Sequence, residues 1–130
     1  MTDIFFDFTT DPVLENNGTW KTLAGGGRIL VARFGNKGFV KACDNLREQN
    51  AEALAKEGGD DLWETLRCGA MAQFILLNWE GITYKGDPVP YSTDKAKEFL
   101  SVKDFRIVVE AVAIDIDNYK VQAEATQTGN

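Results

Sequence analysis

The stretch GTWKTLAGGGRILVARF, residues 18–34, decides the fold that this sequence predicts. Its two ends are rich in β-branched and aromatic residues, which favour strands. Three consecutive glycines at 25–27 supply the backbone freedom that a hairpin loop requires. We therefore predict a β-hairpin over 18–34, with strands at 18–24 and 28–34.

Four later segments have the apolar spacing or the capping residues of helices. Asn36 is a suitable N-cap for the first, and glycines at 58 and 59 end it. Ser101–Asp104 has the S-x-x-D pattern of a capping box for the last. The expected helices span 37–57, 61–79, 92–100 and 102–121, and a frayed polar tail follows over 122–130. The predicted fold class is thus α+β, predominantly α: an N-terminal β-hairpin followed by a small bundle of about four helices.

Length and charge restrict the classes of function. A chain of 130 residues is expected to form a single domain over 1–130. Its net charge of −6 disfavours contacts with nucleic-acid phosphates or anionic membranes. Residues 1–12 have no basic segment, so we expect a loosely structured lead-in and no signal peptide. Cys43 and Cys68 are expected to be buried free thiols in a reducing cytoplasm.

The chain has no histidine, which removes Ser-His-Asp and Cys-His nucleophiles and histidine-bearing zinc sites. The glycine run lacks the GxGxxG spacing of a dinucleotide site, and no Walker A loop is present. Asp115 and Asp117 would point about 200° apart on a helix, so they cannot form a paired acid/base site. We predict no catalytic, cofactor-binding or metal-binding residues, while a site built from carboxylates stays open as an alternative.

The stretch NWEGITYKGDPVPYS, residues 78–92, is interpreted as a rigid connection between two helices. Its prolines favour an extended backbone, and Trp79, Tyr84 and Tyr91 are expected to hold it against the bundle. The last expected helix has a wide apolar face, because a second stripe that includes Ile107 and Ile114 lies beside the main one. That width suits either a central position in a bundle or a partner interface.

Several short patterns together resemble the tail assembly chaperones of long-tailed, siphovirus-type bacteriophages. DPxxExxG begins at Asp11, VARxxNxxF at Val31, WEGI at Trp79 and GxPxPYS at Gly86. Their order and spacing resemble that family over about residues 8–118.

The resemblance implies a non-enzymatic protein that acts in the host cytoplasm and is absent from the mature virion. It implies binding to the tape measure protein and help in recruiting tail tube subunits, without nucleic-acid or membrane partners. Many such proteins also have a longer product made by a translational frameshift. The candidate partner-binding residues are Trp79, Tyr84, Tyr91, Ile107 and Ile114.

Two other functions stay open at this point. One is a structural head–tail joining or tail completion protein of a phage, and the other is a small carboxylate-dependent enzyme. The open edge of the expected hairpin is a natural site for pairing with another chain, so we also expect self-association into a homo-oligomer.

Overall fold

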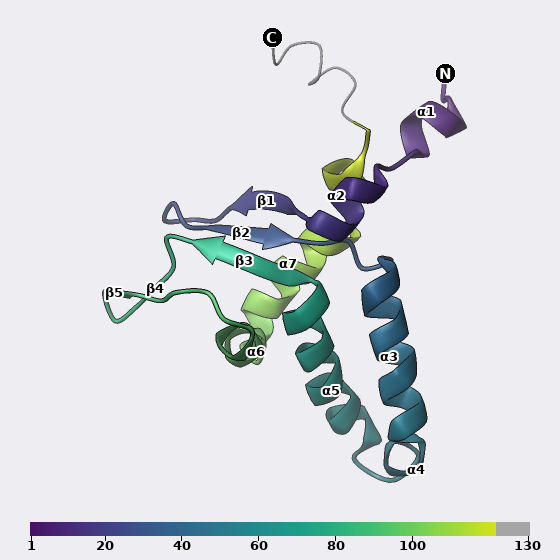
Figure 1. Cartoon of the computed structure of the whole chain (residues 1–130), viewed down its shortest axis with the longest axis vertical. Helices are drawn as coiled ribbons and strands as arrows, with labels where there is room; N and C mark the ends of the chain where they lie inside the picture. Colours follow the sequence, from purple (N-terminus) through teal and green to yellow (C-terminus); the bar gives the residue numbers. More distant parts are fainter. Residues whose placement is uncertain (122–130) are drawn as a thin grey trace.

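The computed structural model describes residues 1–121 and shows a small antiparallel sheet surrounded by helices (Figure 1). The sheet has the strand order β1–β2–β3, and a separate two-stranded hairpin is formed by β4 and β5. The strands are β1 (Thr19–Thr22), β2 (Arg28–Val31), β3 (Leu76–Glu80), β4 (Thr83–Tyr84) and β5 (Asp87–Pro88). Within residues 1–121 the helices are α1 (Ile4–Phe8), α2 (Pro12–Asn17), α3 (Lys37–Gln49), α4 (Ala51–Leu54), α5 (Gly59–Phe74), α6 (Thr93–Leu100), α7 (Lys103–Ile114) and the 3-10 helix η1 (Ile116–Tyr119).

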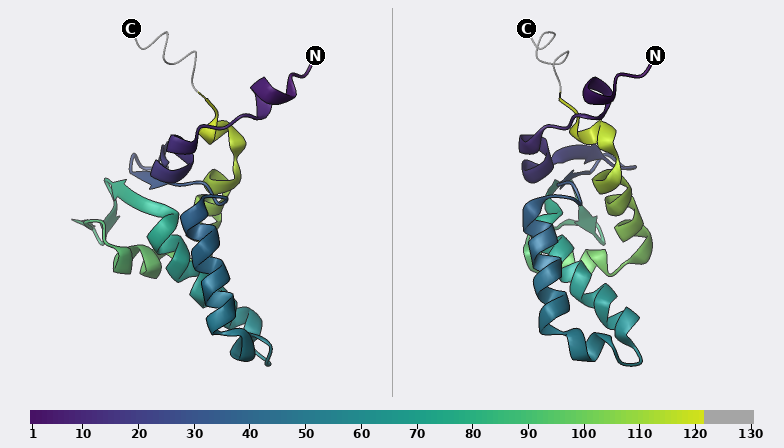
Figure 2. Two further views of the ribbon diagram at one scale, coloured as in Figure 1. Left: turned by 45° about the vertical axis from the view of Figure 1, so that its right-hand side comes forward. Right: turned by 90° about the vertical axis from the view of Figure 1, so that its right-hand side faces the viewer.

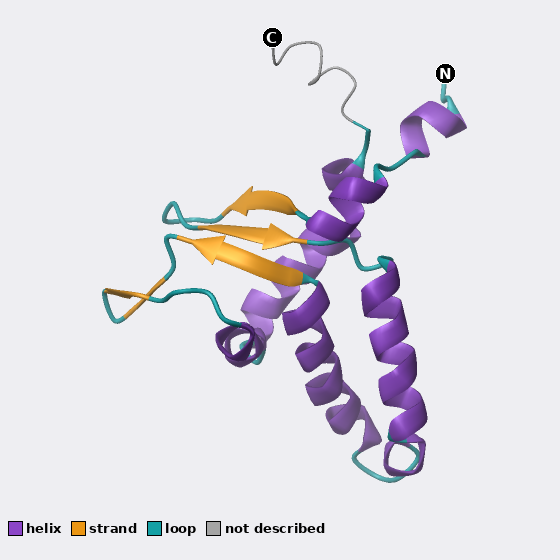
Figure 3. Cartoon of the chain, in the orientation of Figure 1, coloured by secondary structure: helices purple, strands orange, loops and turns teal. Residues whose placement is uncertain are grey.

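The helices divide into three groups around the sheet. Helices α3 and α5 lie side by side, are joined through α4, and project away from the strands (Figures 1 and 2). Helices α6 and α7 pack on each other, with α6 against α5 and α7 against β2. Helix α2 packs against η1, and α1 lies beyond α2 at the N-terminal end of the chain (Figure 3).

The predicted fold class is wrong. Two helices precede the strands, so the chain does not begin with a β-hairpin, and seven α-helices stand in residues 1–121 where about four were expected. β1 and β2 pair antiparallel, but as part of a three-stranded sheet that β3 completes. This third strand was not predicted because β3 comes from a distant segment that was expected to be helical.

The expected helix over 61–79 ends early, at Phe74, and the chain continues as β3. Ile75, Leu76 and Leu77 are apolar in a row, and a short apolar run satisfies a strand as well as a buried helix. The tertiary structure favours the strand, because β3 pairs with the edge of β2 that would otherwise be open. A bulge at Leu77, which is left without a partner on β2, keeps the buried side chains of Leu76 and Trp79 on the inner face.

The lead-in over 1–12 is also more structured than expected. Asp11 caps α2 by accepting a hydrogen bond from the Val13 backbone at 2.9 Å, and Pro12 occupies the first helical turn, where proline is well tolerated. The Asp-Pro pair therefore starts a helix here, at the end of a segment that was expected to be loosely structured.

The third expected helix, over 92–100, corresponds to α6, and the fourth, over 102–121, corresponds to α7. The helix expected over 102–121 ends at Ile114, where Asp115 has an extended backbone and caps η1 through the Asp117 backbone. The expected frayed tail at 122–130 lies outside the described residues.

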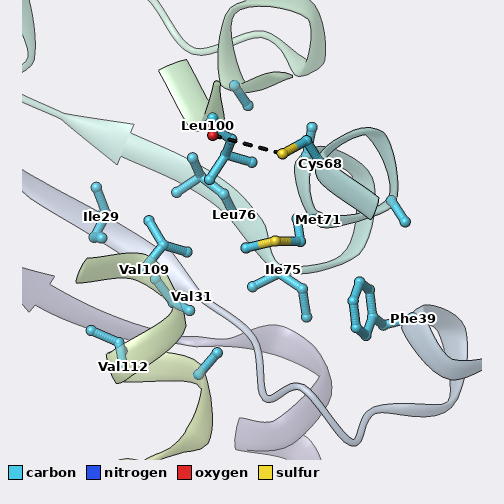
Figure 4. Close-up of a cluster of buried hydrophobic side chains, with 14 of the residues drawn as sticks. Ile29, Val31, Phe39, Cys68, Met71, Ile75, Leu76, Leu100, Val109 and Val112 are labelled. Carbon is cyan, nitrogen blue, oxygen red and sulfur yellow. Dashed lines mark hydrogen bonds between the residues drawn. The ribbon is translucent and has the colours of Figure 1, made fainter. Parts of the chain in front are cut away.

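The hydrophobic core lies where α5 and α7 meet the sheet (Figure 4). Ile29 and Val31 of β2 point into it, and Met71 and Val109 meet them from the helices. Both cysteines are buried free thiols, and burial raises the pKa of the Cys43 thiol. A raised thiol pKa keeps that side chain neutral, as an apolar core requires.

Candidate functional site

Two of the five predicted binding residues lie together at the core: Trp79 is buried in it, and the partly buried Tyr91 packs against it. Trp79 is only 4% exposed, and its indole nitrogen donates a hydrogen bond of 2.7 Å to the Val89 carbonyl. Its ring meets the edge of Tyr91 at 4.9 Å and stacks on Phe99 at 5.1 Å. These contacts fasten the connection between β3 and α6 to the core.

The hydroxyl of Tyr91 also forms hydrogen bonds within the protein. It lies 2.7 Å from the Leu76 carbonyl and 3.2 Å from the Ala72 carbonyl, at the junction of α5 and β3. Burial raises the pKa of this hydroxyl, so it stays a hydrogen-bond donor. Trp79 and Tyr91 therefore stabilise the fold, and their side chains present little surface to a partner.

Tyr84 lies apart from these two, on the β4–β5 hairpin. Its side chain is largely exposed, and the ammonium of Lys85 lies 5.3 Å from its ring centre. Lys85 has a positive φ of 50°, which fits the tight turn that joins the two short strands. Tyr84 is thus accessible, but it is a single aromatic residue on a small hairpin.

Ile107 and Ile114 lie on one exposed face of α7. They are 49% and 66% exposed, and Val108 and Ala111 lie beside them. The spacing of 107, 111 and 114 places three of these side chains within about 60° around the helix axis. We call Ile107, Val108, Ala111 and Ile114 the outer face of α7.

The opposite face of α7 is buried against the sheet and α5. Val109, Val112 and Ala113 pack there in the core. The helix is thus apolar on both sides but covered on only one. A helix in the middle of a bundle would bury both faces. The outer face of α7 is exposed, and an exposed apolar surface of this kind is typical of a protein–protein contact.

Two arginine–glutamate pairs hold α7 against α5 and fix the direction of the outer face. The guanidinium of Arg106 is almost fully buried; it donates to Glu64 at 2.7 Å and to the Leu100 carbonyl at 2.9 Å. On the next turn Glu110 accepts a hydrogen bond of 2.6 Å from Arg67. A face held in this way is presented to a partner without further ordering.

Two further features of residues 1–121 concern metal binding and membrane insertion. Among residues 1–121, no three carboxylate or cysteine side chains are grouped so that they could hold a metal ion. None of the helices in that range combines the length and the apolar character needed to cross a bilayer.

The sequence analysis missed a further apolar surface at the N-terminus. Helix α1 buries none of its residues, and Ile4, Phe5, Phe6 and Phe8 are all more than half exposed. The sequence feature that could have predicted this helix is Asp3, a residue type common at N-caps. It caps α1 by accepting a hydrogen bond of 3.0 Å from the Phe6 backbone.

The fold and its surfaces define a helix-rich protein with two exposed apolar elements, α1 and the outer face of α7. A family model described as YdaY prophage protein matches residues 34–130. The chain belongs to this family, and it is therefore of phage origin. The match begins after β2, so α1, α2 and the first two strands precede it. Neither a search of curated proteins nor a search of solved structures found a match.

Proposed function

We propose that this protein is a non-catalytic tail assembly chaperone, which binds a helix of the tape measure protein of the same phage in the host cytoplasm. The phage origin of the chain and the sequence patterns between Asp11 and Ser92 support this proposal. The single observation that carries it is the outer face of α7, which is apolar, exposed and rigidly held.

The outer face has the shape that an amphipathic helix recognises. Apolar side chains spaced by three or four residues on one helix pack into the corresponding grooves of another. From Ile107 to Ile114 the stripe is roughly 10 Å long at 1.5 Å per residue, which is about two turns of a partner helix. Each copy would cover a short length, so a long tape measure protein would take many copies.

Charge supports the second part of the task, which is to keep the partner soluble. The chain has a net charge of −6, and Asp104 and Asp115 lie exposed near the two ends of the outer face. A helix coated with such copies would expose carboxylates where it had exposed apolar side chains, and like charges oppose aggregation.

Co-expression with the tape measure protein tests the proposal. We expect the wild-type protein to keep a tagged tape measure protein soluble and to co-purify with it. The double variant Ile107→Lys with Ile114→Lys should lose both effects, because two ammonium groups cannot be buried in an apolar interface. Val13→Lys is the matched control, since Val13 is as exposed as Ile114 but lies on α2.

Two results would contradict the proposal. One is a wild-type protein that does not co-purify with the tape measure protein, and the other is a double variant that solubilises it as well as the wild type does. Adding tail tube subunits to the complex tests their recruitment, and mass spectrometry of purified virions tests the expected absence from the mature particle. A protein found in the virion at stoichiometric amounts would favour a head–tail joining or tail completion role.

A further inference from the structure

Helix α1 is an exposed apolar element that no other part of residues 1–121 covers. It lies beyond α2 at one end of the molecule, and the views in Figure 2 agree on this position. Phe5 and Phe6 are 85% and 73% exposed, with Ile4 and Phe8 beside them on the same short helix. Four large apolar side chains on five consecutive residues are too many to be scattered surface residues.

The helix is prepared by local hydrogen bonds but has no packing to stabilise it. Asp3 accepts from the Phe6 backbone, and Asp7 in return accepts a hydrogen bond of 3.0 Å from the Asp3 backbone. Helices shorter than about 12 residues are marginal in water without tertiary contacts. A five-residue helix with a capped N-terminus and nothing buried is therefore suited to docking on another surface.

Within residues 1–121, hydrogen bonds to the body of the protein begin at Thr10. Thr10 forms a β-bridge with Lys120, and the Asp11 backbone donates a hydrogen bond of 2.7 Å to the Tyr119 carbonyl. Thr9 donates to the Phe5 carbonyl of its own helix. Residues 1–9 thus form an arm that can change its position without disturbing the fold.

A receiving surface of the right character lies on α3. Two hollows, of about 410 Å³ and about 320 Å³, meet at Asn45. The first is lined by the exposed Val40, and the second by the half-buried Leu46 and Leu66. We call these two hollows together the α3 groove.

The α3 groove is also basic at its margins, although the chain as a whole is acidic. Lys37 and Lys41 line the first hollow and Lys97 the second, and all three are exposed. Within residues 1–121 none of these lysines forms an ion pair, whereas Asp44 at the same place is paired with Arg47.

We propose that the arm, residues 1–9, docks in the α3 groove of a second copy of this protein, and that two copies exchange their arms reciprocally. The charges are complementary: residues 1–9 carry two aspartates and no basic side chain, and the groove offers three lysines that form no ion pair within residues 1–121. Phe5, Phe6 and Phe8 supply the apolar anchors, and the hollows are large enough for one or two aromatic rings each.

The area supports two exchanged arms over one. Three phenylalanines bury roughly 150–250 Å² each and their groove loses a similar area, so one docked arm lies near the lower limit of a standard interface. Two arms with their two grooves bury twice that area, which exceeds the roughly 1,200 Å² that a stable interface needs. Reciprocal exchange also gives a closed two-fold dimer, which leaves no free arm and no free groove.

Sedimentation of the full-length protein tests the exchange. We expect the wild type to be dimeric at micromolar concentration, and Phe5→Glu with Phe6→Glu to raise the dissociation constant at least tenfold. Lys41→Glu should weaken the dimer from the groove side by several-fold, and added salt should weaken the wild type. Val13→Glu is the control for the arm and Lys21→Glu, on β1, the control for the groove. Because α1 buries no residue, the arm variant should fold as the control does, and the two melting temperatures should agree at concentrations low enough for both proteins to be monomeric.

Cross-linking between differently labelled copies identifies the contact. An equimolar mixture of Phe6→Cys and Asn45→Cys proteins should form a mixed disulfide dimer, whereas Phe6→Cys with Lys21→Cys should not. A monomeric wild type, a dimer that the arm variant leaves intact, or a cross-link that forms only within the Phe6→Cys, Asn45→Cys double variant would overturn the proposal. The last result would mean that the arm docks on its own chain. All these measurements use this protein alone, so they are independent of tape measure binding.

Discussion

The hydroxyl of Tyr119 donates a hydrogen bond of 2.9 Å to the carbonyl of Val31, a residue 88 positions earlier in the chain. Both side chains are fully buried. The bond joins η1 to the central strand of the sheet, and the Tyr119 carbonyl in turn accepts from the backbone of Asp11. One tyrosine thus ties together the N-terminal helices, the sheet and the end of the described chain.

Tyr119→Phe should destabilise the protein by about 1–2 kcal/mol, because it removes the donor and leaves a buried carbonyl short of a partner. For a domain of this size that corresponds to a fall in melting temperature of roughly 3–8 °C. Calorimetry or urea unfolding measures the effect. Tyr84→Phe is the control, since Tyr84 is exposed and should change stability by less than about 0.5 kcal/mol.

The same tyrosine predicts sensitivity to alkaline pH. Burial raises the pKa of Tyr119 above that of an exposed tyrosine, which is about 10. Above that pH the unfolded chain releases this proton while the folded protein retains it. The contribution of Tyr119 to stability should therefore be independent of pH near neutrality and should fall as the pH rises beyond about 10. Urea unfolding between about pH 8 and 11 should show a shallower decline for Tyr119→Phe, and equal slopes would count against it.

Local sequence patterns predicted the helices better than the point at which a helix ends and a strand begins. The spacing of Leu62, Leu66 and Ala70 identifies a helical segment, because period 3.6 repeats over many residues there. The run from Ile75 to Leu77 contains no such information: its residues suit a buried helix or a buried strand, and only the open edge of β2 decides between them. Long-range pairing of this kind cannot be derived from a single sequence.

The candidate site shows the same division. The sequence of the last helix predicts a wide apolar face. Whether each part of that face is buried or exposed depends on which elements pack against it. Ile107 and Ile114 turn outward, whereas Trp79 and Tyr91 turn inward, although all four have side chains common in interfaces. Helix α1 was missed because a helix of five residues is too short for a periodicity to be recognised.

Gly27 and Gly81 show that two distant turns touch, and this contact makes a prediction. A Cβ on Gly27 would lie 2.8 Å from the carbonyl oxygen of Gly81, so the end of β3 would have to move. Gly27→Ala should cost about 1–3 kcal/mol, as overpacking against backbone does. Gly35→Ala is a matched control, because no atom lies within 4 Å of its added Cβ. A smaller loss for Gly27 than for Gly35 would mean that the turns are free to separate.

The ion pair of Arg106 on α7 with Glu64 on α5 helps to hold the two helices together. Substitution of its two residues should lower the stability of the protein by unequal amounts. Arg106 has a nearly buried side chain that also donates to the Leu100 carbonyl, whereas the Glu64 side chain is 59% exposed. Arg106→Ala removes buried packing together with two hydrogen bonds, so we expect a loss of about 2–4 kcal/mol. Glu64→Gln leaves an amide oxygen to accept and exchanges a mostly solvated ion pair, so its loss should stay below about 1 kcal/mol.

Urea unfolding of the two single variants measures this difference, and hydrogen exchange along α7 shows where it acts. Arg106→Ala should speed exchange of the α7 amides first, since the contacts of Arg106 hold that helix to α5. If the helix loosens in this way, the outer face is no longer presented as one rigid stripe, and co-purification with the tape measure protein should weaken together with amide protection. Equal losses for both variants would show that the ion pair, and not the buried contacts of Arg106, holds α7 in place.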